Sequence, residues 1–162
     1  MQTPAEFTES LRLASTLHES ANLLGIRLNS LEAKVINRKL EPPYDVVAEL
    51  TPNVSVGVKT ITFEVQYEVT ALAEEQEVFR ISCAFQAGYE HELDDVTVDM
   101  ASTYGDVIVL ATLHPYVREL VHRVSSDLGF PGLFLDNLDS KDLFRLLSEE
   151  EIRKRTSDED YA

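Results

Sequence analysis

The histidines and one acidic turn are the first side chains to consider for chemistry. No two of the four histidines, His18, His91, His114 and His122, have the i, i+4 spacing that places two metal ligands on one helix face. The turn at residues 90–95 carries four carboxylates but lacks the ordered oxygen-ligand spacing of a calcium loop. We therefore expect no metal site and interpret the turn as an acidic surface loop.

Nucleophilic and phosphate-binding motifs are missing as well. Cys83 alternates with Phe79, Ile81 and Phe85, so we expect a buried thiol that behaves as a small hydrophobic side chain. The six glycines are dispersed and form no phosphate-binding loop, and the sequence has no Gly-x-Ser-x-Gly elbow. These features predict no cofactor and no enzymatic activity. An enzyme built around His114 and nearby acids is kept as an alternative hypothesis.

Length and charge exclude further classes. The chain has 162 residues and a net charge of -15, with 14 basic against 29 acidic side chains, which argues against nucleic-acid and anionic-membrane partners. No apolar run reaches the roughly 18 residues that a membrane-spanning helix needs, and the first ten residues lack the features of a signal peptide. With a single cysteine, the sequence predicts one cytoplasmic domain without membrane insertion.

A helix is predicted at the N-terminus, over residues 4–22. Thr3 can cap it, Pro4 suits its first position and Glu6 completes a capping box. Apolar residues follow at spacings of three and four, so one face packs on the sheet or docks on a partner.

The middle of the chain predicts an antiparallel sheet over about residues 24–89. Two strands, at 60–72 and 79–89, alternate apolar with polar residues, and the connection between them is short. These alternating residues form either the core under the helices or an interface.

The two strands before them are less regular. The apolar residues of the segment 24–36 change parity, which predicts a β-bulge near Asn29 and Ser30. A strand from 45 to 50 is followed by a Thr-Pro-Asn sequence, and residues 54–58 either continue this strand or form a separate one.

Helices are predicted after the sheet, at about 97–128 and 141–154. Pro115 lies inside the first of them and predicts a kink, and Gly129 ends it. Residues 156–162 form an acidic tail that we expect to be disordered. Strands grouped before helices indicate an α+β fold, with a four-stranded antiparallel sheet, helices on one face and an extra N-terminal helix, all in one domain over residues 1–155.

A motif joins the end of the long helix to the segment after it. It consists of a Pro-Tyr-x-Arg-Glu helix, a Gly-Phe-Pro-x-Leu-x-Leu segment, an Asp/Asn-rich turn and an apolar run. Its residues are Pro115, Tyr116, Arg118, Glu119, Gly129, Phe130, Pro131, Leu133, Leu135, Leu143 and Phe144.

With these residues the chain resembles the SecB family of bacterial export chaperones. The resemblance covers about residues 24–147 and implies a homotetramer, a dimer of dimers, that holds unfolded polypeptide clients in apolar grooves without ATP. The N-terminal helix lies outside the core pattern and looks more like the SecB-like proteins of toxin–antitoxin systems. The implied partners are unfolded chains, with the translocase motor or an antitoxin as a further partner.

One feature of the family is missing. Members that serve the translocase motor present carboxylates at outward positions of the first and third strands. The matching positions here are Ser30, Lys34, Arg80 and Ser82, and none is acidic. This puts delivery to the motor in doubt and favours a chaperone with one dedicated client. A module that binds a folded partner is the alternative from another class.

Apolar surface beyond the needs of the core is expected in the segment from Tyr44 to Val58 and on the outer face of the long helix. The candidate client-binding or interface residues are Tyr44, Val47, Leu50, Val56, Phe79, Ile81, Cys83, Phe85 and Tyr116.

Overall fold

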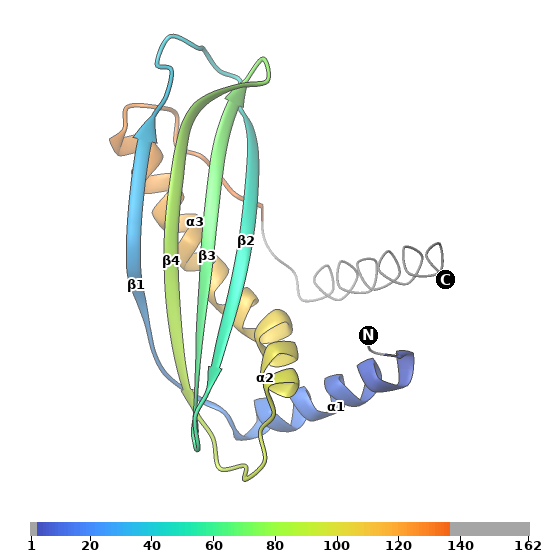
Figure 1. Cartoon of the computed structure of the whole chain (residues 1–162). Coiled ribbons are helices and arrows are strands. Elements are labelled where there is room, and N and C mark those ends of the chain that lie inside the picture. The colour runs from blue at the N-terminus through green and yellow to red at the C-terminus, as the bar shows by residue number, and fades with distance from the viewer. Residues whose placement is uncertain (1–2, 137–162) are drawn as a thin grey trace.

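The computed structural model describes residues 3–136, and a four-stranded antiparallel sheet with helices on one face dominates it (Figure 1). This confirms the predicted α+β class, and the extra N-terminal helix is present. The predicted helix at 141–154 and the tail at 156–162 lie outside the described residues.

The strands are long and follow the order β1-β4-β3-β2 across the sheet. Both edges of the sheet are therefore formed by the two irregular strands of the sequence. The bounds are β1 Asn22–Val35, β2 Asp45–Val56, β3 Thr60–Ala73 and β4 Gln76–Glu90.

The two central strands separate their side chains between two faces, as their alternation predicts. From Ile61 to Ala73, every second residue of β3 is buried, and the residues between them are exposed or half-buried. Every second side chain of β4 from Phe79 to Tyr89 lies on the same buried face, because directly paired residues of neighbouring strands share a face. We call this the helix side of the sheet and the opposite face the outer side.

The irregularities of the edge strands have local causes. The register of β1 against β4 shifts between Leu28 and Ser30, which confirms the predicted bulge. Pro52 does not interrupt β2, which pairs with β3 continuously from Asp45 to Val56. A proline without an N–H is tolerated here because β2 is an edge strand and needs backbone donors on one side only.

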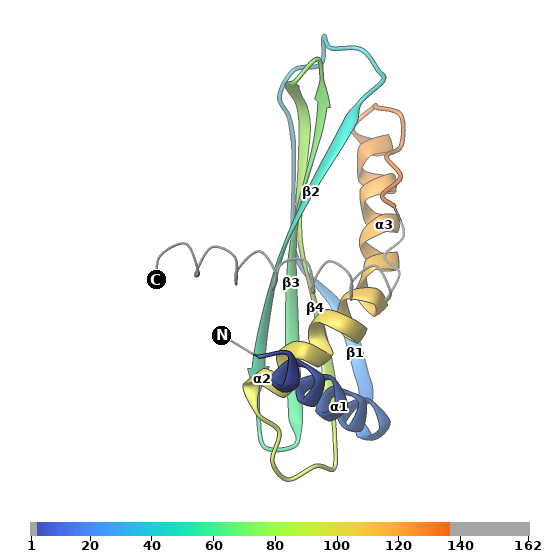
Figure 2. The ribbon, with the colours of Figure 1, turned by 90° about the vertical axis from the view of Figure 1, so that its right-hand side faces the viewer.

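The N-terminal helix α1, Pro4–Ser20, begins with the predicted capping box. The Thr3 hydroxyl accepts a hydrogen bond from the Glu6 N–H at 3.2 Å, and the Glu6 carboxylate accepts from the Thr3 N–H. Ala14 and Leu17 are buried, and α1 packs against helix α2 at one end of the sheet (Figure 2).

The helix predicted at 97–128 consists of three joined segments: α2 Val98–Tyr104, the π-helical turn η1 Gly105–Val109 and α3 Leu110–Asp127. Pro115 lies inside α3 and is exposed. None of the helices in residues 3–136 combines the length and the apolar character that crossing a membrane requires.

Gly105 lies at a close contact between the helical layer and the sheet. A Cβ atom at this position would come 2.8 Å from a ring carbon of Phe63. Phe63 cannot easily give way, because its ring contacts Tyr89 and Tyr104 at centroid distances of 5.7 and 5.9 Å. The glycine therefore permits the π-helical turn to pack directly on β3.

We predict that Gly105→Ala lowers the free energy of unfolding by about 1–3 kcal/mol, because a methyl group overpacks this contact. Helix propensity alone would raise it by up to about 1 kcal/mol, so the sign of the change is diagnostic. Urea denaturation followed by circular dichroism measures it. The matched control is Gly88→Ala, whose Cβ meets no atom within 4 Å, and its stability should not fall.

Candidate functional site

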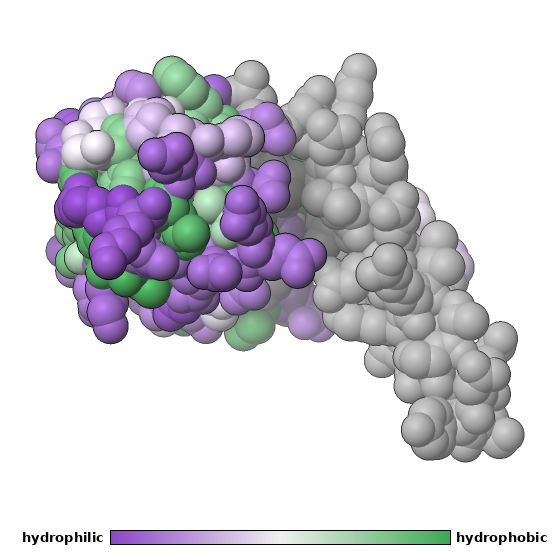
Figure 3. Space-filling model, turned by 90° about the horizontal axis from the view of Figure 1, so that it is seen from above, coloured by the Kyte–Doolittle hydropathy of each residue, from purple (hydrophilic) through white to green (hydrophobic). Residues whose placement is uncertain are grey.

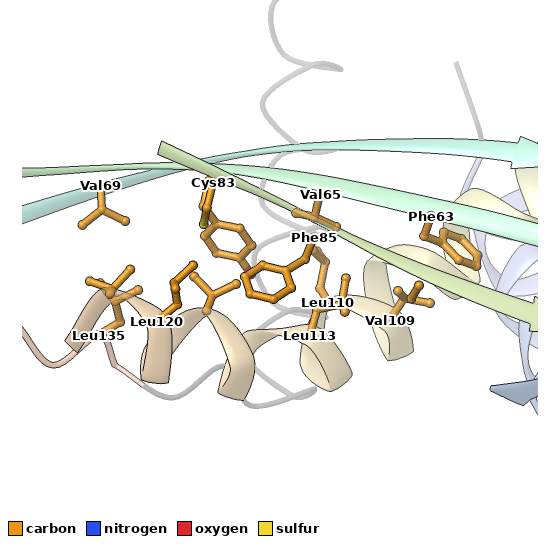
Figure 4. Close-up of a cluster of buried hydrophobic side chains, with 14 of the residues drawn as sticks. Phe63, Val65, Val69, Cys83, Phe85, Val109, Leu110, Leu113, Leu120 and Leu135 are labelled. Atoms are coloured by element: carbon orange, nitrogen blue, oxygen red, sulfur yellow. The ribbon is translucent and has the colours of Figure 1, made fainter. Parts of the chain in front are cut away.

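Helix α3 covers only the middle of the sheet. Its buried side chains, including Leu113, Val117 and Leu120, face the central strands. Figure 4 shows Leu110, Leu113 and Leu120 pointing toward Val65, Cys83 and Phe85 on β3 and β4. The helix side of the two edge strands therefore has less cover than the centre.

On β1 this leaves a row of apolar side chains that we call the β1 strip, consisting of Ile26, Leu28, Leu31 and Ala33. They pair with Ala87, Phe85, Cys83 and Ile81 of β4, so they lie on the helix side. Leu28 and Leu31 are nevertheless 42% and 45% exposed. The β1 strip is thus apolar surface next to the core rather than part of it.

The opposite edge carries a second row, the β2 strip, consisting of Val46, Ala48, Leu50 and Pro52. These residues pair with Ala71, Val69, Tyr67 and Val65 of β3 and also face the helix side. Val46 and Leu50 are 38% and 37% exposed. The sheet thus has one apolar strip on each side of α3.

After α3 the chain turns back as an extended segment, residues 130–136, which we call the strap. Three side chains of α3 hold its backbone. The Ser125 hydroxyl accepts from the Leu133 N–H at 2.9 Å, Arg118 Nε donates to the Leu135 carbonyl at 2.7 Å, and His114 Nε2 lies 2.5 Å from the Asp136 carbonyl. Polar side chains of the helix thus replace the missing backbone partners of this segment.

The strap lies on the β2 side of α3. The ring of Phe130 stacks on Phe79 at 4.4 Å and contacts Tyr44, the residue before β2, at 6.0 Å. Figure 4 places Leu135 near Val69 and Leu120. Because Val69 pairs with Ala48, the strap runs one strand away from the β2 strip and forms a wall beside it.

Phe134 is the side chain that the strap presents to solvent. It is 75% exposed, between the buried side chains of Leu133 and Leu135, and its ring stacks on His122 at 4.4 Å. A Cβ on Gly132 would come 2.3 Å from the same imidazole, so only glycine lets the strap lie this close. The backbone bonds of its neighbours Leu133 and Leu135 and the stacking of its ring on His122 therefore fix the position of Phe134.

His114 connects the strap to the sheet. Its Nδ1 atom lies 3.3 Å from the Tyr67 hydroxyl, and both residues are buried. Burial lowers the pKa of His114, as does the positive charge of Arg118, whereas the bond to the Asp136 carbonyl raises it. Burial raises the pKa of neighbouring Cys83 to about 11, so this thiol stays protonated and unreactive.

The candidate residues named from the sequence fall into different places. Phe79, Ile81, Cys83 and Phe85 are buried on the helix side of β4, in the core rather than on the surface of the described chain. Among the others, Leu50 belongs to the β2 strip, Tyr44 and Val56 are half-buried, Tyr116 is exposed on α3 beside Phe85, and Val47 is exposed on the outer side.

The β1 strip and Phe134 were not among those candidates. The parity change in β1 was visible in the sequence, but alternation alone does not tell which apolar residues a helix will cover. For Phe134 the available signal was the glycine two residues before it, which indicates a close approach of the backbone.

The four positions that match the carboxylate positions of motor-serving family members lie together on the outer side. They are Ser30, Lys34, Arg80 and Ser82. Lys34 is paired directly with Arg80, and Ser82 is paired with Glu32. Arg80 also lies 2.6 Å from the Glu77 carboxylate, so part of its charge is neutralised. Hydrophilic residues dominate the end of the molecule that carries the β3–β4 turn, and hydrophobic surface is visible between them (Figure 3).

Comparison with known proteins identifies a family for this arrangement. The model of the family described as "Preprotein translocase subunit SecB" matches residues 28–151. The protein-export protein SecB of Ehrlichia chaffeensis is 30% identical over 129 residues, which cover 76% of this chain and 62% of that protein. The protein of the same name from Ehrlichia canis is 25% identical over 159 residues, covering 98% and 78%.

A solved structure shares the fold. It is the SecB-like chaperone of Mycobacterium tuberculosis in complex with a ChAD peptide from an antitoxin, with a TM-score of 0.75 and 24% identity. The match covers 79% of this chain and 97% of that one.

The free energies of unfolding of two alanine variants test whether the β1 strip lies outside the core. Ile81→Ala should lower the free energy of unfolding by about 2–5 kcal/mol, because it leaves a cavity under α3. Leu31→Ala, on the neighbouring strand, should cost less than about 1 kcal/mol because its side chain is already 45% exposed. Equal losses in urea denaturation would contradict this assignment.

Proposed function

The chain belongs to the SecB family, and on this premise we propose that it is an ATP-independent chaperone that binds non-native polypeptides and keeps them from aggregating. The observation that carries the proposal is the pair of apolar strips on the helix side of β1 and β2. Their leucines and valine are 37–45% exposed in a chain with a large buried core beside them. Contiguous apolar surface of this kind marks a binding site.

The shape of the strips suits an extended client. Each strip presents alternate residues along one strand, and a side chain recurs about every 6.6 Å along a strand. An unfolded chain in extended conformation has the same repeat and can place successive apolar side chains along the strip without a fixed sequence. The net charge of -15 favours clients with basic residues between the apolar ones.

A dedicated client is the second candidate. It is supported by the solved SecB-like chaperone of similar fold, which holds a peptide of an antitoxin. On this alternative the present chain serves one protein, such as an antitoxin, and binds it tightly.

Delivery of clients to the translocase motor gains no support from the outer side of the sheet. The positions where motor-serving relatives carry carboxylates are Ser30, Lys34, Arg80 and Ser82, and two of them are cationic. A partner that recognises carboxylates there would meet a directly paired lysine and arginine instead.

We further propose that the chain acts in the cytoplasm as a homotetramer. Strand β1 supports self-association, because it is an edge strand with exposed leucines and without a proline to block pairing. Strand β2 is less suited, since Pro52 removes a backbone donor from its middle.

Binding to an unfolded probe tests the chaperone function. We expect calorimetry in low salt to give micromolar or tighter binding to reduced, carboxamidomethylated ribonuclease A and none to the native enzyme. Leu50→Asp should weaken binding at least fivefold, because it introduces a charge into the β2 strip. Thr51→Asp, one residue along and on the outer side, is the matched control.

Three other results would each point elsewhere. Binding to the native enzyme alone would favour a module for folded partners. Binding to neither form would favour a dedicated client, and a pull-down would then have to recover one. Equal losses for Leu50→Asp and Thr51→Asp would exclude the β2 strip as the client site.

Self-association has its own measurement. Light scattering should give about four times the 18.2 kDa chain mass. Leu31→Lys on the β1 strip should reduce that mass without unfolding the chain, because it charges the proposed edge interface. A wild-type protein that is strictly monomeric would contradict the tetramer.

A further inference from the structure

The Tyr67–His114–Asp136 connection suggests a role for His114 that goes beyond packing. A backbone carbonyl can only accept, so the 2.5 Å contact to Asp136 requires the proton on His114 Nε2. In the neutral ring Nδ1 is then an acceptor, and it accepts from the Tyr67 hydroxyl at 3.3 Å. Neutral His114 thus satisfies a buried donor on β3 and an acceptor on the strap at the same time.

We propose that His114 is the positioning residue that couples the strap to the sheet and that it does so only as a neutral imidazole. This inference rests on the proposed function in one respect, namely that the strap forms a wall of the client site beside the β2 strip. The coupling itself is a property of the chain and can be measured without a client.

Protonation reverses the hydrogen bond between His114 and Tyr67. With a proton on both nitrogens, Nδ1 becomes a donor, and the Tyr67 hydroxyl loses the acceptor of its own hydrogen. Tyr67 is 1% exposed, so the hydroxyl has no access to water as a replacement. A buried charge and a buried hydroxyl hydrogen without an acceptor are both unfavourable, and the structure relaxes where it can open.

The groups around His114 make the strap the side that opens. Facing it are the Tyr67 hydroxyl on β3, the Cys83 thiol next to Tyr67 on β4, the Arg118 guanidinium on α3 and the exposed Asp136 on the strap. Strands β3 and β4 are paired on both sides in the centre of the sheet, whereas three side-chain bonds from α3 hold the strap backbone beyond Phe130. Hydration of the imidazolium therefore separates the strap from β3.

The direction of the pH dependence follows from the lowered pKa of His114. Stability from the neutral ring is fully present above the unfolded-state value of about 6.5, and it is lost as the pH falls through the lower folded-state pKa. The strap should consequently be ordered at pH 7.5 and loosened on acidification, with a midpoint below about 6.5.

A fluorescent probe on the strap tests this. The chain has no tryptophan, and Phe134 is 75% exposed, so Phe134→Trp gives a single reporter at a tolerant position. The His122 ring stacks on this residue and would perturb the fluorescence of the reporter, so the reference protein also carries His122→Gln. Fluorescence anisotropy is followed from pH 8 to pH 5, with far-ultraviolet circular dichroism to show that the fold persists.

We expect anisotropy of the reference protein to fall on acidification while the circular dichroism stays constant. His114→Gln, which keeps a donor for the Asp136 carbonyl but does not titrate, should abolish the transition. His18→Gln, at an exposed position on α1, should leave it unchanged. A transition that survives in His114→Gln, or a reference protein without one, would overturn the proposal.

Measuring the binding of an unfolded client at two pH values separates this inference from the proposed function. With the unfolded ribonuclease probe, binding should weaken at least threefold between pH 7.5 and pH 5.5 in wild type and remain constant in His114→Gln. Equal pH dependence of binding in both proteins would remove the strap from the client site. If neither protein binds the probe, the proposed function fails while the anisotropy result still decides the role of His114.

Discussion

One geometric constraint governs this structure: a single helix is narrower than a four-stranded sheet. Neighbouring strands lie about 4.8 Å apart, so the outer backbones are about 14 Å apart, whereas a helix with its side chains is about 10 Å wide. Helix α3 can therefore bury the helix side of β3 and β4 but not that of β1 and β2. The two apolar strips, with Leu31 on one and Leu50 on the other, are the direct result.

The strap modifies this result on one side only. It adds apolar cover beside β3, but as an extended segment without strand partners it must satisfy its backbone in another way. Ser125, Arg118 and His114 do so from three positions along α3, and each bond ties a polar atom of the helix to the strap. The β2 strip is consequently bordered by a wall, whereas the β1 strip lies along a free edge. This asymmetry is the physical reason to assign the β2 strip to clients and the β1 strip to self-association.

The parts of the fold that depend on local pattern could be predicted from the sequence. Alternation identified β3 and β4, the parity change located the bulge near Ser30, and Thr3 with Glu6 predicted the capping box. The continuity of β2 through Pro52 could not be settled, because it depends on β2 being an edge strand. The candidate site was only partly predicted for a similar reason: Ile81 and Leu31 are both apolar strand residues, and only the path of α3 buries one and exposes the other.

Exposed apolar strips create a solubility problem that the charge of the chain counteracts. Apolar surface of this kind promotes contact between copies, while a net charge of -15 makes copies repel one another before they touch. The repulsion is largely screened beyond about 8 Å at physiological ionic strength, so it opposes the contacts that bring the acidic surfaces of two copies close together. A client with few negative charges does not meet this barrier. The same charge that keeps the free chain soluble therefore also favours capture of apolar and basic segments over unspecific association with itself.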